Sequence, residues 1–385
     1  MTGLAARIER VEPSATLAIS SVAKELRAEG ADVVDLSVGE PDFPTPEPIV
    51  EAGIKAMQAG HTGYTAPRGI PALREAIATE LATDDLEYGP EQIIVTPGGK
   101  QALYEVFQTV VDEGDEVVLL DPAWVSYEAM AKLAGGTLRR VDLTGSNFQL
   151  EPALDELTAA VSDDTQLLVI NTPSNPTGMV YTDDALAAVR DLAVDHDVTV
   201  ISDEIYKRIT YGRTPISLAT LDGMADRTVT INGFSKTYAM TGWRLGYLAG
   251  PTSIIDQAAK LQSHSVSCAT NFVQHAGVAA LTDVDQEVDE MVVAFEERRD
   301  HLVDRLEAAG ASVPAVPDGA FYLMVPVVGD DLDTCETAIQ EAHVATTPGS
   351  AFGAPGYARL SYANSTERID EALDRLFDLE YFRTD

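Results

Sequence analysis

The sequence predicts an α/β protein, with a large domain built on a mostly parallel, doubly wound sheet and a small α+β domain beside it. Apolar, β-branched runs alternate with amphipathic stretches from residue 92 to residue 232, which is typical of successive strand–helix units. The chain has 385 residues, more than one small core can hold, which indicates a second domain. We expect an N-terminal arm and part of the small domain in residues 1–45, the large domain in 46–283, and the small C-terminal domain with an interdomain helix in 284–385.

The composition has a large excess of acid. The chain has 26 lysine and arginine residues against 62 aspartate and glutamate residues, a net charge of −36. Such a surface repels nucleic acid and anionic membranes, so neither is expected as a partner. The acid is spread along the chain in short pairs, which indicates a halophilic protein whose self-repulsion is screened by salt. Since no membrane span or export leader is recognised, we expect a cytoplasmic protein whose two cysteines are reduced.

The residues before the predicted sheet are expected to form an arm, helices and loops. The prolines that follow Gly39 forbid a helix. A glycine at the end of a strand lets the backbone approach a ligand, although loops without a functional role share this pattern. Tyr64 lies in a second loop broken by glycine and proline, where local packing is the alternative to a functional role. The expected elements are an arm and helix within residues 1–30, a strand at 33–38, and helices at 47–59 and 71–81.

Five strand ends of the predicted sheet carry residues suited to a ligand. The carboxyl ends of parallel strands lie at one edge of a sheet, where ligands bind. Two of these residues have a structural alternative, since Trp124 could lie in the core and Asp203 could cap the following turn. The expected strands are at residues 92–96, 116–120, 166–171, 198–202 and 228–232, and they lead in that order to Gly99, Trp124, Asn175, Asp203 and Lys236.

The first of these strand ends predicts an anion site. Pro97-Gly98-Gly99-Lys100-Gln101 follows the strand and opens a helix through Phe107. The first N–H groups of a helix have no internal partner, and the helix dipole favours negative charge there. The backbone N–H groups of Gly99 and Lys100 are therefore candidates to bind a phosphate.

Lys236 is the candidate reactive amine. It lies in the segment NGFSKTYAMTGWRLGY, residues 232–247, among small and polar neighbours that are typical of a pocket. An amine that forms an imine must lose its proton, which partial burial and a nearby cation both favour. Arg244 would be that cation, and its planar guanidinium suits a phosphate. The alternative is a surface loop with a solvated lysine and arginine, but lysine is scarce in this chain, which favours chemistry for Lys100 and Lys236.

The C-terminal third predicts the rest of the small domain. Arg359 lies on the last strand and alternates with its neighbours Ala358 and Leu360. An arginine on such a strand is ordinarily a surface residue. The expected elements are a polar helix start at 263–271, a long helix at 284–309, a loop at 314–321, and strands at 320–325 and 358–362.

Together these motifs resemble the class I aminotransferases of fold type I, which use pyridoxal 5'-phosphate, and they are closest in pattern to the prokaryotic aspartate aminotransferase subgroup. The resemblance covers nearly the whole chain. It implies a seven-stranded sheet in the large domain and a homodimer with shared active sites. The segments that carry it are residues 36–46, 63–69, 97–101, 171–178, 203–206, 233–236 with 244–246, and 357–362.

The resemblance implies a role for each matching residue. Lys236 would hold the cofactor as an imine and later move a proton between substrate and cofactor, assisted by Asp203 at the ring nitrogen and Tyr206 at the ring oxygen. Asn175 would also bind the ring oxygen and Trp124 would stack on the ring. The phosphate would be bound by Gly99, Lys100, Arg244 and by Tyr64 of a neighbouring subunit. The substrate would be bound by Gly39, Trp124, Asn175, Arg359, Lys100 and Thr16.

One position departs from the pattern. Gly233 stands where relatives commonly have a phosphate-binding serine. Either Ser235 replaces that donor or the phosphate has fewer contacts.

The substrate implied is an acidic amino acid. Lys100 and Thr16 match positions with which the subgroup recognises a second carboxylate, so we expect the amino group of aspartate or glutamate to move to a 2-oxo acid such as 2-oxoglutarate in a ping-pong cycle. Prephenate or arogenate, another aminotransferase specificity, and a carbon–sulfur β-lyase are the alternatives. Alanine and aromatic substrates would leave the lysine unpaired at a desolvation cost. A non-catalytic DNA-binding regulator is disfavoured by the acidic charge and the lack of an added domain.

Overall fold

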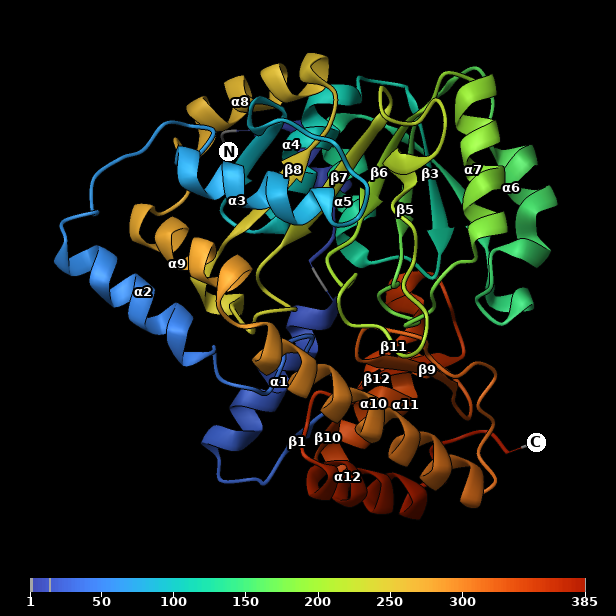
Figure 1. Ribbon diagram of the computed structural model, residues 1–385. Helices are drawn as coiled ribbons and strands as arrows, with labels where there is room; N and C mark the ends of the chain where they lie inside the picture. The colour runs from blue at the N-terminus through green and yellow to red at the C-terminus, as the bar shows by residue number, and fades with distance from the viewer. Residues whose placement is uncertain (1–2, 14, 385) are drawn as a thin grey trace.

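The computed structural model describes residues 3–13 and 15–384, except the side chains of residues 15–18. A seven-stranded sheet forms the centre of the larger part of the molecule, drawn in the upper half of Figure 1. Its strand order is β2-β8-β7-β6-β5-β3-β4, and only β8 runs antiparallel to its neighbours within this described sheet. The predicted mostly parallel sheet is therefore confirmed. The strands are β2 (Ile93–Thr96), β3 (Glu116–Asp121), β4 (Thr137–Asp142), β5 (Thr165–Asn171), β6 (Thr199–Asp203), β7 (Thr228–Gly233) and β8 (Gly246–Ala249).

Helices cover both faces of this sheet, because its central strands are apolar on both sides. In β5, Leu167 and Val169 pack into one cluster while Leu168 and Ile170 pack into another on the opposite face. The first cluster includes side chains of α4 (Gly99–Val110), α5 (Val125–Ala134) and α8 (Thr252–Ser265). The second includes side chains of α6 (Leu154–Ala160) and α7 (Asp183–Asp195), and a third cluster joins the β2 side of the sheet to α3 (Pro71–Ala82) and α9 (Asn271–Thr282). Helix α2 (Glu47–Gln58) packs on α9.

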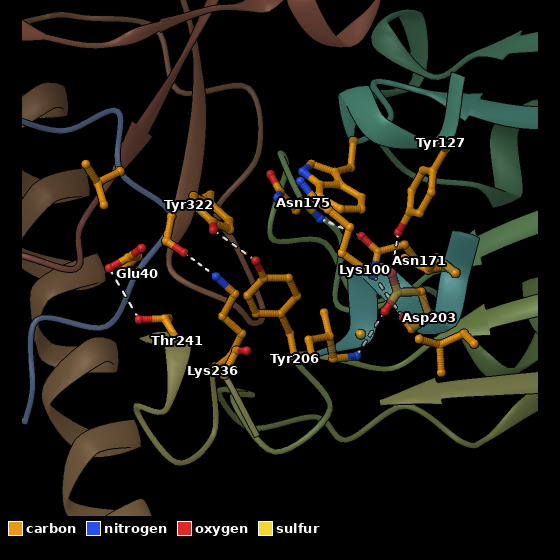
Figure 2. A pocket seen from close by; sticks show the side chains of 18 of the residues that line it. Glu40, Lys100, Tyr127, Asn171, Asn175, Asp203, Tyr206, Lys236, Thr241 and Tyr322 are labelled. Atoms are coloured by element: carbon orange, nitrogen blue, oxygen red, sulfur yellow. Dashed lines mark hydrogen bonds between the residues drawn. The ribbon is translucent and has the colours of Figure 1, made fainter. Parts of the chain in front are cut away.

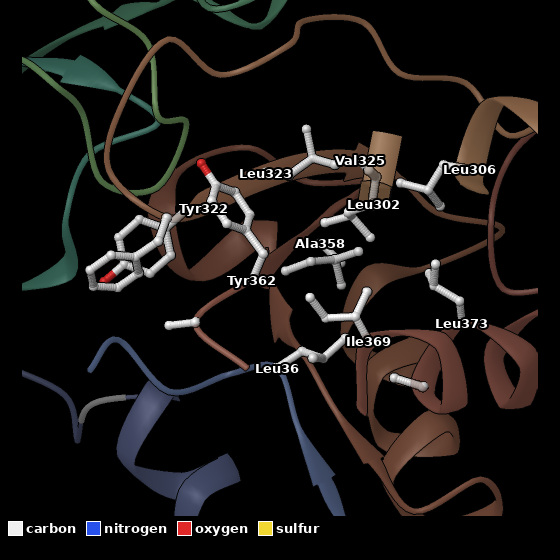
Figure 3. Packing of buried hydrophobic residues seen from close by; sticks show 14 of the residues in the cluster. Leu36, Leu302, Leu306, Tyr322, Leu323, Val325, Ala358, Tyr362, Ile369 and Leu373 are labelled. Carbon is white, nitrogen blue, oxygen red and sulfur yellow. The ribbon is translucent and has the colours of Figure 1, made fainter. Parts of the chain in front are cut away.

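The smaller part contains two small sheets and several helices. One sheet has the order β11 (Thr347–Pro348), β12 (Tyr357–Ser361), β9 (Tyr322–Pro326), all antiparallel, and the other pairs β1 (Val34–Asp35) with β10 (Val344–Ala345). Figure 3 shows side chains of β9, β12, α10 (Asp285–Ala308) and α12 (Thr366–Asp378) meeting in one core with Leu36. Helices α1 (Ala15–Ala28) and α11 (Asp331–Glu341) complete this part.

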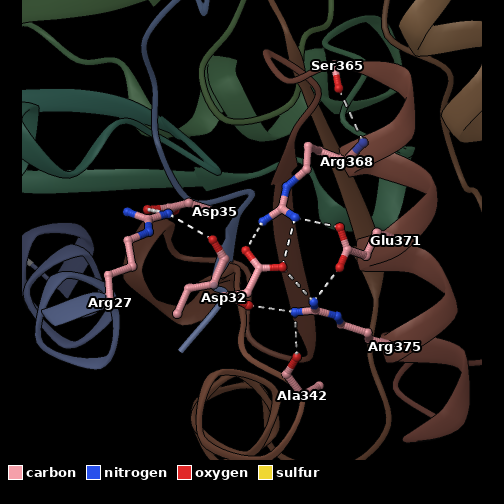
Figure 4. A network of polar contacts seen from close by, with 9 residues as sticks. Arg27, Asp32, Asp35, Ala342, Ser365, Arg368, Glu371 and Arg375 are labelled. Atoms are coloured by element: carbon pink, nitrogen blue, oxygen red, sulfur yellow. Dashed lines mark hydrogen bonds and ion pairs between the residues drawn. The ribbon is translucent and has the colours of Figure 1, made fainter. Parts of the chain in front are cut away.

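Ion pairs also attach the N-terminal segment to α12 (Figure 4). The Asp32 carboxylate accepts hydrogen bonds from Arg368 at 2.9 and 3.0 Å and from Arg375 at 3.1 Å. These partners, chiefly the hydrogen bond from Arg368, lower the pKa of Asp32 to about 2. Arg375 also donates to the carbonyl of Ala342, beside β10. The segment around Asp32 is therefore tied to α12, whereas Arg10, nearer the chain start, pairs with Glu113 in the larger part.

Three expectations for the secondary structure were wrong. The strand expected at 33–38 pairs only at Val34–Asp35 because the next backbone groups bind elsewhere; for example, the Ser37 carbonyl accepts from Arg359. The helix start expected at 263–271 is instead the break between α8 and α9, where Ser267 has a positive φ of 68°. Strand β8 was missed because it is short and directly follows the lysine loop.

In the part of the chain that the structure describes, none of the helices combines the length and the apolar character that crossing a bilayer requires.

Candidate active site

A cavity of about 400 Å³ lies at the carboxyl edge of the large sheet, between that sheet and the smaller part (Figure 2). This size is typical of a site for a small molecule. All five predicted strand-end residues line it, together with residues from β9, β12 and the segment that ends at Glu40. The predicted site residues that line it are Gly39, Gly99, Lys100, Trp124, Asn175, Asp203, Tyr206, Lys236, Arg244 and Arg359.

Lys236 follows β7 and reaches across the cavity, where its Nζ donates to the carbonyl oxygen of Gly39. Burial lowers the pKa of Lys236 to about 8; the charges of Arg359, Arg244 and Lys100 act in the same direction, and only Glu40 among the main contributors opposes them. About a tenth of the amine is therefore neutral at pH 7, far more than for a solvated lysine. A neutral lysine amine in a cavity is a nucleophile for a carbonyl compound.

Asp203 ends β6 and is buried, with 4% of its surface exposed. Its Oδ2 accepts from the hydroxyl of Tyr127 at 2.6 Å and its Oδ1 from the backbone N–H of Ile205 at 3.2 Å. Burial raises the pKa of Asp203 to about 6 in spite of these two hydrogen bonds. The backbone is fixed as well, because Asn171 donates to the Asp203 carbonyl at 2.9 Å. A buried carboxylate of this kind is stabilised by a cationic partner in the cavity.

Arg359 enters the cavity from β12 and is only 3% exposed. It is therefore not a surface residue, as an arginine on such a strand ordinarily would be. Its guanidinium donates to Asn175 Oδ1 at 2.9 Å and to the Ser37 carbonyl at 2.6 Å. The Nε atom has no hydrogen-bond partner among the described residues. A buried guanidinium with an unpaired N–H next to a cavity is suited to an incoming carboxylate.

The amino end of α4 forms a cationic cradle. Gly98 has a positive φ of 88°, and a Cβ there would lie 2.5 Å from Arg244 Nη2, so the backbone and the guanidinium approach closely. Lys100 Nζ lies 4.8 Å from the centre of the Trp124 ring. Burial, and then the charge of Arg244, lower the pKa of Lys100. A helix N-terminus with an arginine and a lysine beside it favours an anion.

The departure at Gly233 has a steric reason. A Cβ at Gly233 would lie 3.1 Å from the Cα of Gly246 and 3.2 Å from the carbonyl oxygen of Leu245, both at the adjacent antiparallel strand. A serine at this place would press on that backbone. Ser235 is buried and lines the cavity, which leaves it available as the alternative donor.

The comparisons with known proteins agree along almost the whole chain. Residues 31–376 match the family model described as aminotransferase class I and II. The chain belongs to this family. It is 44% identical to an aspartate aminotransferase of Geobacillus stearothermophilus, over 97% of this chain and 98% of that one, and 42% identical to an aspartate/prephenate aminotransferase of Thermus thermophilus with the same coverage. The structure of Thermus thermophilus aspartate aminotransferase with maleate superimposes with a TM-score of 0.95 and 41% identity, over 98% of this chain and 100% of that one.

This aminotransferase is an enzyme that depends on pyridoxal 5'-phosphate, and its cavity fits that cofactor in three respects. Lys236 supplies an amine with a lowered pKa for the aldehyde. Asp203 supplies a buried carboxylate for a protonated pyridine nitrogen. The backbone N–H groups at Gly99 and Lys100 and the guanidinium of Arg244 would supply hydrogen-bond donors and positive charge for the phosphate. The resemblance found in the sequence is thus confirmed at the level of family, enzyme class and cofactor.

Two predicted site residues of the aminotransferase are not placed in the cavity. Tyr64 lies in the loop between α2 and α3, is 89% exposed, and does not line the cavity in the described part of the chain. Thr16 falls within α1, and its side chain lies outside the described residues. The expected roles of both residues stay predictions.

The sequence did not single out several lining residues of the aminotransferase. Tyr127 lies three positions after Trp124 on α5, so helical spacing gave a signal for it. Tyr322 on β9 gave no comparable local signal, because its neighbours in the site come from distant segments. The other lining residues that were missed include Ser37, Glu40 and Thr241, and the last two are linked by a hydrogen bond of 3.3 Å.

Proposed function

We propose that this aminotransferase moves the amino group of aspartate or glutamate to a 2-oxo acid such as 2-oxoglutarate in a ping-pong cycle. The observation that carries this proposal is the pair of cationic side chains in one cavity, Arg359 from β12 and Lys100 from α4. Each can bind one carboxylate of a dicarboxylic acid. The names of the relatives, aspartate aminotransferase among them, support the same substrate class.

The residues of the cavity divide the chemistry among them. Pyridoxal 5'-phosphate, when bound, supplies a ring that withdraws electrons from the substrate α-carbon. Lys236 would hold the cofactor covalently, and its free amine would move the proton at the substrate α-carbon, since a lysine with a pKa of about 8 can serve as both base and acid. Asp203 keeps positive charge on the ring nitrogen, which maintains the ring as an electron acceptor.

Binding and orientation are assigned to the remaining residues. Arg359 and the backbone at Gly39 would orient the α-carboxylate, and Asn175, whose Oδ1 accepts from Arg359, would donate its side-chain N–H to the ring oxygen. Tyr206 would offer its hydroxyl to the same oxygen, and Trp124 would stack on the ring. Lys100 and Thr16 are proposed to bind the distal carboxylate of the substrate.

We also propose a homodimer with shared sites. Tyr64, at 89% exposure, has a polar tip free to reach a phosphate in a second copy, and the nearby α2 exposes Ile54 and Met57 at 44% and 43%. Exposed apolar side chains such as these would be covered in a dimer interface. Analytical ultracentrifugation tests the oligomer, and a monomer with full activity would contradict this arrangement.

We also propose the domain boundaries, the cellular location and the adaptation to salt. The cores around the large sheet and around β9 and β12 support domains at 46–283 and at 1–45 with 284–385. The net charge of −36 supports a halophilic protein, and we propose that it is cytoplasmic.

The substrate is tested by single-turnover spectra of the cofactor-loaded protein with a panel of amino donors. We expect aspartate and glutamate to convert the absorbance of the lysine-bound cofactor much faster than alanine or phenylalanine. The reverse order would overturn the acidic-substrate proposal. Pyruvate release from cystathionine would indicate a carbon–sulfur lyase instead.

A second candidate is amino transfer to prephenate, which is favoured by three relatives named aspartate/prephenate aminotransferase at 41–42% identity, two of them as probable assignments. Turnover of arogenate in the same panel, at a rate close to that of aspartate, would support it.

A further inference from the structure

Tyr322 lies at the meeting point of three residues of the proposed site (Figure 2). It belongs to β9 in the smaller part, is fully buried, and lines the cavity. Its hydroxyl lies 2.9 Å from the hydroxyl of Tyr206, which comes from the larger part. The Arg359 Cζ lies 4.5 Å from the centre of the Tyr322 ring. A Cβ at Gly39 would lie 2.5 Å from the Tyr322 hydroxyl oxygen, so this hydroxyl packs closely on the backbone of Gly39. The carbonyl of the same residue accepts from Lys236.

The two hydroxyls share one hydrogen bond, in which either oxygen can be the donor. A tyrosine hydroxyl has one proton and can also accept, so only one proton lies between the two oxygens. Burial raises the pKa of both hydroxyls and the charge of Arg359 opposes the rise in both, so the protein surroundings leave either hydroxyl able to donate. If Tyr322 donates, the Tyr206 proton is free to point into the cavity.

We propose that Tyr322 is a positioning residue that acts in two ways: its hydroxyl orients that of Tyr206 toward the ring oxygen of the cofactor, and its ring supports the guanidinium of Arg359. This inference rests on the proposed function, because it takes the roles of Tyr206 and Arg359 from it. The two halves of the side chain can be separated by substitution, since phenylalanine keeps the ring and leucine removes it.

The hydroxyl is tested with Tyr322→Phe by a pH titration of the absorbance of the lysine-bound cofactor. A hydrogen bond to the ring oxygen favours the form that has lost a proton, because that form places more negative charge on the oxygen. Loss of the Tyr322 hydroxyl therefore raises the pKa of this titration, by about three- to tenfold in proton affinity, or about half to one unit. We expect kcat to fall while KM for aspartate changes little.

The ring is tested with Tyr322→Leu. This variant should show the same titration shift and, in addition, a higher KM for dicarboxylates, because the guanidinium loses one of the two aromatic rings near it and keeps only that of Phe352. Tyr362→Phe is the matched control: Tyr362 is also a buried tyrosine of the smaller part, its hydroxyl is 3.4 Å from the Ala320 carbonyl, and it does not line the cavity in the described structure. The control should leave both the titration and KM unchanged.

A double substitution decides whether Tyr322 acts through Tyr206. In a Tyr206→Phe background, Tyr322→Phe should add no further titration shift, whereas independent effects would add. If wild type shows no lysine-bound absorbance, the proposed function fails. If wild type titrates and Tyr322→Phe, folded by circular dichroism, titrates as wild type does, or if the two shifts add, the inference about Tyr322 alone is wrong.

Discussion

The hydroxyl of Tyr127, on α5, donates a hydrogen bond of 2.6 Å to the carboxylate of Asp203, at the end of β6. Both side chains are buried, with 3% and 4% of their surfaces exposed. A helix on one face of the sheet thereby fixes the carboxylate that we assign to the cofactor nitrogen. It also lowers the cost of keeping that carboxylate charged, because the donated proton lies against one of its oxygens.

Tyr127→Phe is expected to weaken cofactor binding. The hydrogen bond from Tyr127 lowers the pKa of Asp203, so its loss raises that pKa further above the present value of about 6 and protonates the carboxyl at higher pH. We expect about tenfold weaker binding of pyridoxal 5'-phosphate at pH 7, with a smaller loss at pH 8.5. Fluorescence titration of the cofactor-free proteins measures the affinity of variant and wild type at each pH. A variant that binds the cofactor as tightly as wild type at both pH values would contradict this role of Tyr127.

The rate of covalent cofactor attachment should follow the protonation of Lys236. The amine reacts only when neutral, and its pKa is lowered to about 8. The attachment rate should therefore rise from pH 6 through pH 8 and level off above it. Stopped-flow absorbance over this range gives the midpoint. A midpoint near that of a solvated lysine would show that the surrounding burial and cations do not act on this amine.

The two proposed carboxylate sites should be separable by substitution. Arg359→Lys keeps the charge but loses the planar guanidinium, so catalytic efficiency should fall about ten- to a hundredfold for aspartate and alanine alike. Lys100→Met should lower efficiency for aspartate by a similar factor and leave alanine little changed. Steady-state kinetics with both donors tests this pattern. An equal loss for both donors in Lys100→Met would remove Lys100 from substrate choice.

Glu105, on α4, provides a stability test outside the reaction. It is buried, accepts a hydrogen bond from Gln101, and has its Oε2 unpaired in the described part of the chain. Burial raises the pKa of Glu105 to about 7. Because the pKa of Glu105 is higher in the folded state than in the unfolded state, the unfolding free energy falls as the pH rises from about 4.5 to about 7. The Glu105→Gln variant has no carboxyl group to ionise at this position, so its unfolding free energy does not fall in this way.

We therefore expect the change in unfolding free energy caused by Glu105→Gln to be more favourable at pH 8 than at pH 5, by about 1–3 kcal/mol. Any fixed cost of burying the amide is the same at both pH values and cancels from this difference. Urea unfolding at the two pH values measures it. A pH-independent difference between variant and wild type would mean that Glu105 does not titrate in this range.

Much of the site could be predicted because it follows from local pattern. Buried strands are marked by short apolar runs, and each predicted strand end held a residue of a distinctive type, as with Asp203 and Lys236. Once the sheet is parallel, those ends meet at one edge. The mostly parallel sheet and the convergence of these residues were both confirmed.

Contacts between distant segments could not be predicted in the same way. Arg359 and Asn175 are 184 positions apart, and no local pattern indicates that the arginine is buried against that amide. Tyr322 has the same difficulty, because its contacts with Tyr206 and Gly39 depend on how the smaller part packs on the larger. The strand expected at 33–38 was too long for a related reason, since the carbonyl of Ser37 binds the distant Arg359 and does not continue the pairing with β10.

The most direct test is borohydride reduction of the cofactor-loaded protein followed by mass spectrometry of its peptides. We predict a reduced pyridoxyl adduct on Lys236 in wild type and in Lys260→Ala, a control at an exposed lysine, and no adduct in a folded Lys236→Ala variant. An adduct on another lysine of the wild-type protein, or an undiminished adduct in Lys236→Ala, would contradict the central claim.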